Sequence, residues 1–117
     1  MSGAISYHAG VFAETAVARR YEASGHRMRA RRWRGQGGEI DLVFERGEEV
    51  VFVEVKKSRS FAAAARALRP AQVSRLLAAG AEYLGNLPRG SLTPARFDVA
   101  LVNADSEVEL IENALWA

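Results

Sequence analysis

Residues 38–56 read GEIDLVFERGEEVVFVEVK, and they constrain the fold more than any other stretch of the chain. Apolar and charged residues alternate over 39–44, and they alternate again in the opposite order over 50–56. This is the period of a half-buried strand. Gly47 lies among charged residues between the two segments and supplies a turn. The stretch therefore predicts a β-hairpin.

The register of this hairpin follows from the alternation of its side chains. A turn of even length at 47–48 sets Asp41 opposite Glu54, and the same register sets Glu39 opposite Lys56. One face is then wholly apolar and consists of Ile40, Leu42, Phe44, Val51, Val53 and Val55. A slip of one residue would mix charges into that face. The register therefore gathers three carboxylates and one ammonium group at the open end of the hairpin.

Such a cluster of carboxylates is unfavourable by itself. Opposed like charges destabilise a sheet, and a desolvated carboxylate takes up a proton unless a cation neutralises it. A hard divalent ion such as Mg²⁺ binds oxygen ligands and usually takes one or two carboxylates. The alternative is a solvated edge with Lys56 as a simple counter-ion. We favour the metal site because both strands are too apolar for an exposed ribbon.

The whole chain excludes several other classes of protein. Its 117 residues predict a single domain over 1–117. It has no cysteine, which rules out thiolate metal sites and cysteine nucleophiles, and its two histidines, His8 and His26, disfavour a zinc site. No apolar run approaches the length of a membrane span, and the N-terminus lacks the apolar core of a signal peptide. We expect a cytoplasmic protein with no membrane partner.

The remaining periodicities predict a mixed α/β architecture. We expect a flexible leader over 1–9, a helix over 11–24, a strand over 26–34, a mobile loop or loose helical turn over 57–69, a helix over 70–84, and strands over 96–102 and 108–111. Asp98 shares a face with Arg96 in an arrangement that requires no catalytic role. A mixed central sheet of about five strands, flanked by two main helices, accommodates this order.

Two polar residues on the predicted helices have both a functional and an ordinary interpretation. Glu14 lies close to the apolar stripe of the first helix, where it either complements the helix dipole or adds a fourth carboxylate to the hairpin cluster. Gln72 lies in the first turns of the later helix, together with Arg75. These two side chains either face the cluster or are ordinary exposed polar residues.

Arginines are concentrated just before the hairpin. Their planar guanidinium groups suit phosphate, and a positive stripe attracts nucleic acid. Solvated arginines that balance the nearby carboxylates are the alternative. Because they adjoin the acidic cluster, we favour a polyanion partner. The arginines in question are Arg19, Arg20, Arg27, Arg29, Arg31, Arg32 and Arg34.

The segment after Lys56 is also basic. It contains Lys57 and Arg59, and it is either a positive flap that closes over a phosphate backbone or a disordered connector.

Several short motifs together resemble the YraN family. They are Ala-Glu at 13–14, GEIDLV at 38–43, FVEVK at 52–56, the helix at 70–84 and RFDV at 96–99. The family is grouped with predicted endonucleases related to archaeal Holliday-junction resolvases, within the PD-(D/E)XK superfamily. The resemblance covers residues 10–102 and implies a restriction-endonuclease-like fold.

The resemblance also implies roles for individual residues. Asp41 and Glu54 would bind Mg²⁺ or Mn²⁺, and Lys56 would orient or deprotonate the attacking water. Glu14 matches the helix glutamate that completes the site in resolvase-like members, and Gln72 falls where many relatives carry lysine or glutamine. The chain departs from the family pattern at 13, where glycine is usual, and at 57–58, where an arginine commonly follows the motif lysine.

These observations lead to three hypotheses for function. The first is a Mg²⁺-dependent nuclease that acts on DNA, with branched or structured DNA among the candidate substrates. The second is a nucleic-acid-binding module that keeps the nuclease fold without catalysis, and the third is a protein-interaction domain in which the acidic face is structural. Junction resolvases act as dimers, so the resemblance also allows a homodimer, although no apolar patch in the sequence demands one.

Overall fold

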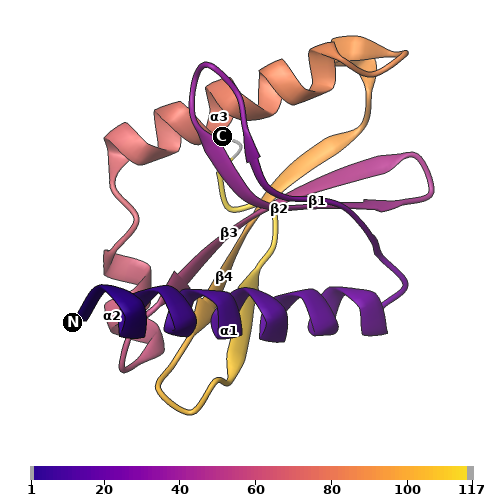
Figure 1. Ribbon diagram of the computed structural model, residues 1–117. Helices are drawn as coiled ribbons and strands as arrows, with labels where there is room; N and C mark the ends of the chain where they lie inside the picture. The colour runs from indigo at the N-terminus through magenta and orange to yellow at the C-terminus, as the bar shows by residue number, and fades with distance from the viewer. Residues whose placement is uncertain (1, 116–117) are drawn as a thin grey trace.

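The structure, a computed structural model, describes residues 2–115, with side chains from residue 10 onwards, and it confirms the predicted α/β class. A mixed sheet of five strands is flanked by two long helices and one short helix (Figure 1). The elements are α1 (Ser2–Ala23), β1 (Arg27–Arg34), β2 (Glu39–Arg46), β3 (Glu49–Lys57), α2 (Phe61–Arg66), α3 (Pro70–Gly85), a 3-10 turn (Gly90–Leu92), β4 (Ala95–Val102) and β5 (Val108–Ile111).

The strands follow one another across the sheet in chain order, β1-β2-β3-β4-β5. The first three form an antiparallel meander, and β5 is antiparallel to β4. Only β3 and β4 are parallel among the described strands, and the connection between them contains α2 and α3. A parallel pair requires such a crossover, which places the start of α3 near the end of β3.

The two long helices lie on opposite faces of the sheet (Figure 1). On one face, Val17 and Tyr21 of α1 pack with a buried cluster that includes Leu42, Phe44 and Val53. The cluster on the other face, beside α3, consists of Ile40, Val43, Val50, Phe52, Leu76, Ala79, Leu84 and Phe97. The sheet is therefore buried on both faces, as its apolar strands predict.

Gly80 lets α3 lie close to the sheet. A Cβ atom added at this position would stand 2.8 Å from Phe97 Cε2 and 3.3 Å from Phe52 Cε2. Both aromatic side chains are fully buried, so neither has free space into which to move. The contact fixes α3 over the middle of the sheet.

The predicted hairpin register is confirmed where β2 and β3 pair. The pairs run from Arg46–Glu49 at the turn to Leu42–Val53. Gly47 has φ of 60°, the left-handed conformation that primed hairpin turns require at their first central position. Continued by one residue, this register sets Asp41 opposite Glu54.

Ile40, however, does not share the apolar face that was predicted for it. It packs in the cluster beside α3, whereas Leu42 packs beside α1. Regular alternation would keep the two side chains on one face, so the strand turns over at Asp41. The neighbouring strand changes face at the same level. Arg32 has φ of 53°, Arg31 contacts α1, and Trp33 contacts Tyr83 of α3.

The structure differs from the expected leader, and it favours the helical alternative for the segment after Lys56. Residues 2–9 of the expected leader form the first turns of α1, because no proline interrupts the chain there and an established helix extends at little cost. Within 57–69, residues 61–66 form α2, capped by Ser60, whose Oγ accepts the N–H of Ala63. None of the helices within 2–115 has the length and hydrophobicity needed to cross a membrane.

Candidate active site

Asp41, Glu54 and Lys56 meet at one end of the sheet, beside the first turn of α3. Asp41 lies near the start of β2, whereas the other two lie near the end of β3, and antiparallel pairing brings these ends together. A pocket of about 220 Å³ opens at this point. It is lined by Gly38, Glu39, Asp41, Glu54, Gln72, Arg75 and Leu76.

Asp41 marks the point where the two strands separate. Its Oδ2 atom accepts a hydrogen bond from the backbone N–H of Val55 at 2.8 Å. The backbone pairing of β2 with β3 ends at Leu42–Val53, so the carboxylate satisfies a backbone donor just beyond the paired region. This bond fixes the Asp41 side chain against β3.

Glu54 is the most buried acidic side chain of the pocket, with 4% of its surface exposed. Its Oε2 atom accepts a hydrogen bond from Gln72 Nε2 at 2.7 Å. The same oxygen lies 3.0 Å from Lys56 Nζ, and the Lys56 side chain is itself largely buried. The structure thus brings Gln72 to Asp41, Glu54 and Lys56, which the predicted hairpin register had already gathered at one end of the hairpin.

The two carboxyl groups retain a proton near neutral pH. Burial, and then the negative charge of Asp41, raises the pKa of Glu54 to about 8, against the lowering effect of Lys56. Burial also raises the pKa of Asp41, although the N–H of Val55 lowers it. The two groups line the same pocket and each affects the pKa of the other, so the proton belongs to the pair.

This shared proton makes the stability of the metal-free protein depend on pH. The pKa of Glu54 in the folded protein, about 8, exceeds its ordinary value of 4.5, so the folded protein binds more protons than the unfolded chain between these limits. We expect the free energy of unfolding in EDTA to fall by roughly 5 kcal/mol as the pH rises across that range. Urea unfolding at successive pH values measures this fall in the free energy of unfolding. In Glu54→Gln this component should be absent, and identical pH profiles for the two proteins would contradict the assignment.

Glu14 approaches the pocket from α1, but arginines hold its carboxylate. Its Oε1 atom lies 3.3 Å from Arg31 Nε and 3.2 Å from Arg32 Nε. The negative charge of Glu14 contributes to the raised pKa of Asp41, which places the two groups near each other. Glu14 does not line the pocket, and the two arginines fix its carboxylate and offset its charge.

Glu39 lines the pocket without the predicted partner. The β2–β3 ladder ends before it reaches Glu39 and Lys56, so that pairing does not form. Glu39 instead lies opposite Arg34 of β1, and their side chains form an ion pair at 3.0 Å. The separation of β2 and β3 at Asp41 is the physical reason for this difference.

Most of the β1 arginines predicted to bind nucleic acid are already paired with carboxylates. Arg29, Lys57 and Arg59 are exposed, and among the described residues they form no ion pair. The paired ones are Arg27 with Glu45, Arg31 and Arg32 with Glu14, and Arg34 with Glu39. Most arginines of β1 therefore balance nearby carboxylates, which is the alternative to a role in binding a polyanion.

The pocket fits a hard divalent cation held by two carboxylates. Among the described residues no group of three or more His, Cys, Asp or Glu side chains is arranged to hold a metal ion. Mg²⁺ usually takes only one or two carboxylates and keeps several waters, and the open pocket leaves room for them. Burial of the two carboxyl groups raises the pKa of each, and a divalent cation would take the place of the proton. The chemistry of the pair therefore suits Mg²⁺ or Mn²⁺.

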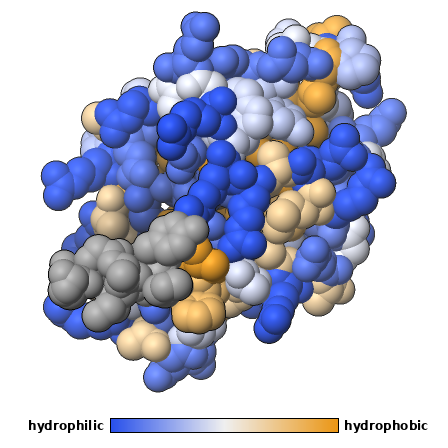
Figure 2. All heavy atoms as spheres, viewed as in Figure 1, coloured by the Kyte–Doolittle hydropathy of each residue, from blue (hydrophilic) through white to orange (hydrophobic). Residues whose placement is uncertain are grey.

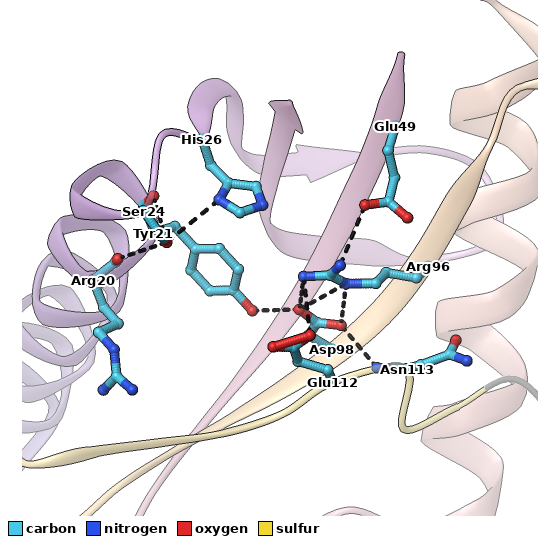
Figure 3. Close-up of polar contacts among 9 residues, drawn as sticks. All are labelled: Arg20, Tyr21, Ser24, His26, Glu49, Arg96, Asp98, Glu112 and Asn113. Atoms are coloured by element: carbon cyan, nitrogen blue, oxygen red, sulfur yellow. Dashed lines mark hydrogen bonds and ion pairs between the residues drawn. The ribbon is translucent and has the colours of Figure 1, made fainter. Parts of the chain in front are cut away.

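A second polar cluster, which the sequence analysis had interpreted as ordinary, lies on the α1 face (Figure 3). Asp98 of β4 is fully buried, with 0% exposure. It accepts hydrogen bonds from Tyr21 Oη at 2.6 Å, Arg96 Nε at 3.0 Å and the backbone N–H of Asn113 at 2.9 Å. Its position between the apolar residues Phe97 and Val99 is the signal that could have revealed it, because a buried charge needs partners. This cluster joins α1, β4 and the C-terminal turn.

Fold and site define the class as a small α/β protein with a buried carboxylate pair and a lysine at one end of a mixed sheet. The family model described as "Uncharacterised protein family UPF0102" matches residues 13–102. The chain belongs to this family.

Similar proteins include a UPF0102 protein of Cereibacter sphaeroides strain KD131, which is 58% identical over 117 residues that cover 100% of both chains. A UPF0102 protein of Ruegeria pomeroyi is 54% identical over 96% of this chain and 91% of its own. One of Dinoroseobacter shibae is 39% identical over 89% of this chain and 78% of its own. The similarity therefore extends over at least 78% of the length of each of these relatives.

Proposed function

We propose that this protein is a Mg²⁺-dependent nuclease that hydrolyses phosphodiester bonds of DNA, with Mn²⁺ as an alternative ion. The observation that carries the proposal is that Asp41 and Glu54 line one pocket, with Lys56 Nζ 3.0 Å from Glu54. Their order along two adjacent strands matches the Asp and Glu-x-Lys elements of the PD-(D/E)XK pattern. This agreement supports the resolvase-like assignment made from the sequence.

Each residue of the pocket has a separate task in the proposed reaction. Asp41 and Glu54 would hold the ion, which when bound polarises the scissile phosphate and lowers the pKa of a water molecule. Lys56 would orient that water and stabilise the negative charge that develops on the phosphate oxygens. Gln72 acts through its hydrogen bond to Glu54, which fixes the position of that carboxylate.

The ion pair of Lys56 with Glu54 also supports a second candidate function. With a shared proton, this contact neutralises the pocket in the absence of a cation. A module that binds nucleic acid without cleaving it would not require a metal ion to neutralise these carboxylates. The two functions differ in one property, the dependence of cleavage on a divalent ion.

The test uses labelled four-way junction, flap and duplex DNA incubated with Mg²⁺ or Mn²⁺. We expect cleavage of at least one substrate, and we expect Asp41→Asn to reduce its rate at least about a hundredfold. Asparagine keeps an acceptor for the N–H of Val55 and removes only the charge, so the fold is retained. Cleavage that persists in Asp41→Asn and Glu54→Ala would come from a contaminant. Salt-sensitive DNA binding without any cleavage would favour the second candidate.

A further inference from the structure

One segment next to the pocket is basic without any acidic residue. Between Glu54 and Glu82 the chain contains no Asp or Glu, whereas it carries several lysines and arginines. Five of these basic side chains are exposed, and we refer to them as the basic strip: Lys57, Arg59, Arg66, Arg69 and Arg75. Within the part of the chain that the structure describes, none of the five forms an ion pair.

The basic strip differs in this respect from β1, the other arginine-rich element. Arg27 and Arg34 of β1 are ion-paired with Glu45 and Glu39. A paired guanidinium must leave its carboxylate before it binds a phosphate, and that exchange reduces the gain from the new contact. The guanidinium groups of the strip have no such competitor. Their positive charge is available to an incoming polyanion.

The basic strip also reaches the pocket itself. Arg75 lines the pocket together with Glu54 and Gln72, and Lys57 directly follows Lys56 at the end of β3. Arg66 ends α2, and Arg69 is the N-cap residue of α3, without a capping side-chain hydrogen bond. α2 and the first turn of α3 lie on the same side of the molecule (Figure 1), and the surface over that end of α3 is hydrophilic (Figure 2). A chain of phosphates held by the strip would therefore pass the carboxylate pair.

The apolar residues of the segment favour nucleic acid over an anionic membrane surface. A membrane-binding segment presents large apolar side chains beside its basic ones. Here Phe61 and Leu68 instead pack against the buried cluster of Ala64, Val99 and Leu101. The surface that remains offers arginine and lysine charges between alanine side chains, which suits a polar, regularly spaced phosphate backbone.

We propose that the basic strip, and not the arginines of β1, is the main surface that binds the phosphate backbone of the nucleic acid substrate. The inference rests on the proposed function, because it treats the pocket as the place where that backbone is cut. It assigns α2 and the start of α3 to substrate binding. Arg75 then contacts a phosphate adjacent to the scissile bond.

The test measures the salt dependence of DNA binding. Fluorescence anisotropy with labelled duplex and junction DNA in EDTA, over a series of KCl concentrations, gives the slope of log K against log salt. Removal of the two charges in Arg66→Ala/Arg69→Ala should weaken binding at low salt about tenfold and reduce the slope by about 2, since each lost phosphate contact contributes about 0.9. Neither residue lines the pocket, so the carboxylate pair is undisturbed. Thermal unfolding of each variant verifies that it is folded.

The matched control is Arg19→Ala/Arg46→Ala, which removes two exposed arginines that form no ion pair among the described residues and lie outside the strip. Its slope should equal that of the wild type. A wild-type slope in Arg66→Ala/Arg69→Ala, with a reduced slope in Arg29→Ala, would overturn the inference.

The two proposals fail in different ways. If cleavage depends on Asp41 but not on the basic strip, the protein is a nuclease and the role of the strip in DNA binding is rejected. If DNA binding depends on the strip but no metal-dependent cleavage occurs, the strip binds DNA and the nuclease activity is rejected.

Discussion

Replacement of Asp98 by alanine is expected to lower the free energy of unfolding by about 3–5 kcal/mol. Asp98 is fully buried and receives hydrogen bonds from Tyr21, Arg96 and Asn113 (Figure 3). Its removal leaves the buried hydroxyl of Tyr21 and the guanidinium of Arg96 without their main acceptor. Both groups then bear the cost of burial without compensation. Urea unfolding of the purified variant measures the loss.

Two milder substitutions separate the contribution of the Tyr21 hydrogen bond from that of the Asp98 charge. Tyr21→Phe removes a single hydrogen bond and is expected to cost about 1–2 kcal/mol, because the phenyl ring keeps its stacking on Phe44. Asp98→Asn keeps the shape of the side chain and removes the charge that Arg96 requires. It should fall between Tyr21→Phe and Asp98→Ala. A loss below about 1 kcal/mol in Asp98→Ala would show that water or rearrangement replaces the carboxylate.

Lys56→Met is expected to reduce the rate of metal-dependent cleavage by roughly a hundred- to a thousandfold, and to leave metal binding in place. Methionine fills a similar volume without the charge, and the Lys56 side chain is only 18% exposed. Without the ammonium group, the attacking water loses the side chain that orients it, and the charge that develops on the phosphate oxygens loses one stabilising cation beside the metal ion. Cleavage assays give the rate, and the thermal shift caused by Mn²⁺ reports on metal binding independently.

Comparison of Lys56→Met with a carboxylate variant distinguishes a loss of catalysis from a loss of metal binding. Asp41→Asn should lose both cleavage and the Mn²⁺-induced thermal shift, whereas Lys56→Met should lose only cleavage. Lys56→Arg keeps the charge and should retain more activity than Lys56→Met. Full activity in Lys56→Met would contradict the catalytic role, and the ion pair with Glu54 would then have only a structural purpose.

The hairpin could be predicted from the sequence because two local signals agree there. Gly47 supplies the positive φ of the turn, and the alternation of apolar and charged residues allows only one register. That register was sufficient to place Asp41 beside Glu54. The position of Gln72 needed the tertiary structure, because its contact depends on how the crossover returns α3 to the sheet.

The errors of prediction have one physical origin, which is that local periodicity does not report irregular backbone. Ile40 changes face because the strand turns over at Asp41, and nothing in the alternation of residues 39–44 signals this. Glu39 meets Arg34 instead of Lys56 for the same reason. The flanking apolar residues could have indicated that Asp98 is buried, but its partner Tyr21 lies 77 residues away in the sequence, so the full network needed the tertiary structure.

The strand order has a consequence for how the molecule assembles. β1, β2 and β3 are neighbours both in the sheet and in the sequence, so their pairing closes only short loops and needs little chain entropy. The parallel pairing of β3 with β4 must wait for the long crossover. The strands that carry Asp41, Glu54 and Lys56 thus belong to the part of the chain that can form early. The crossover then adds Gln72 and Arg75, so the docking of α3 is the folding step that completes the pocket.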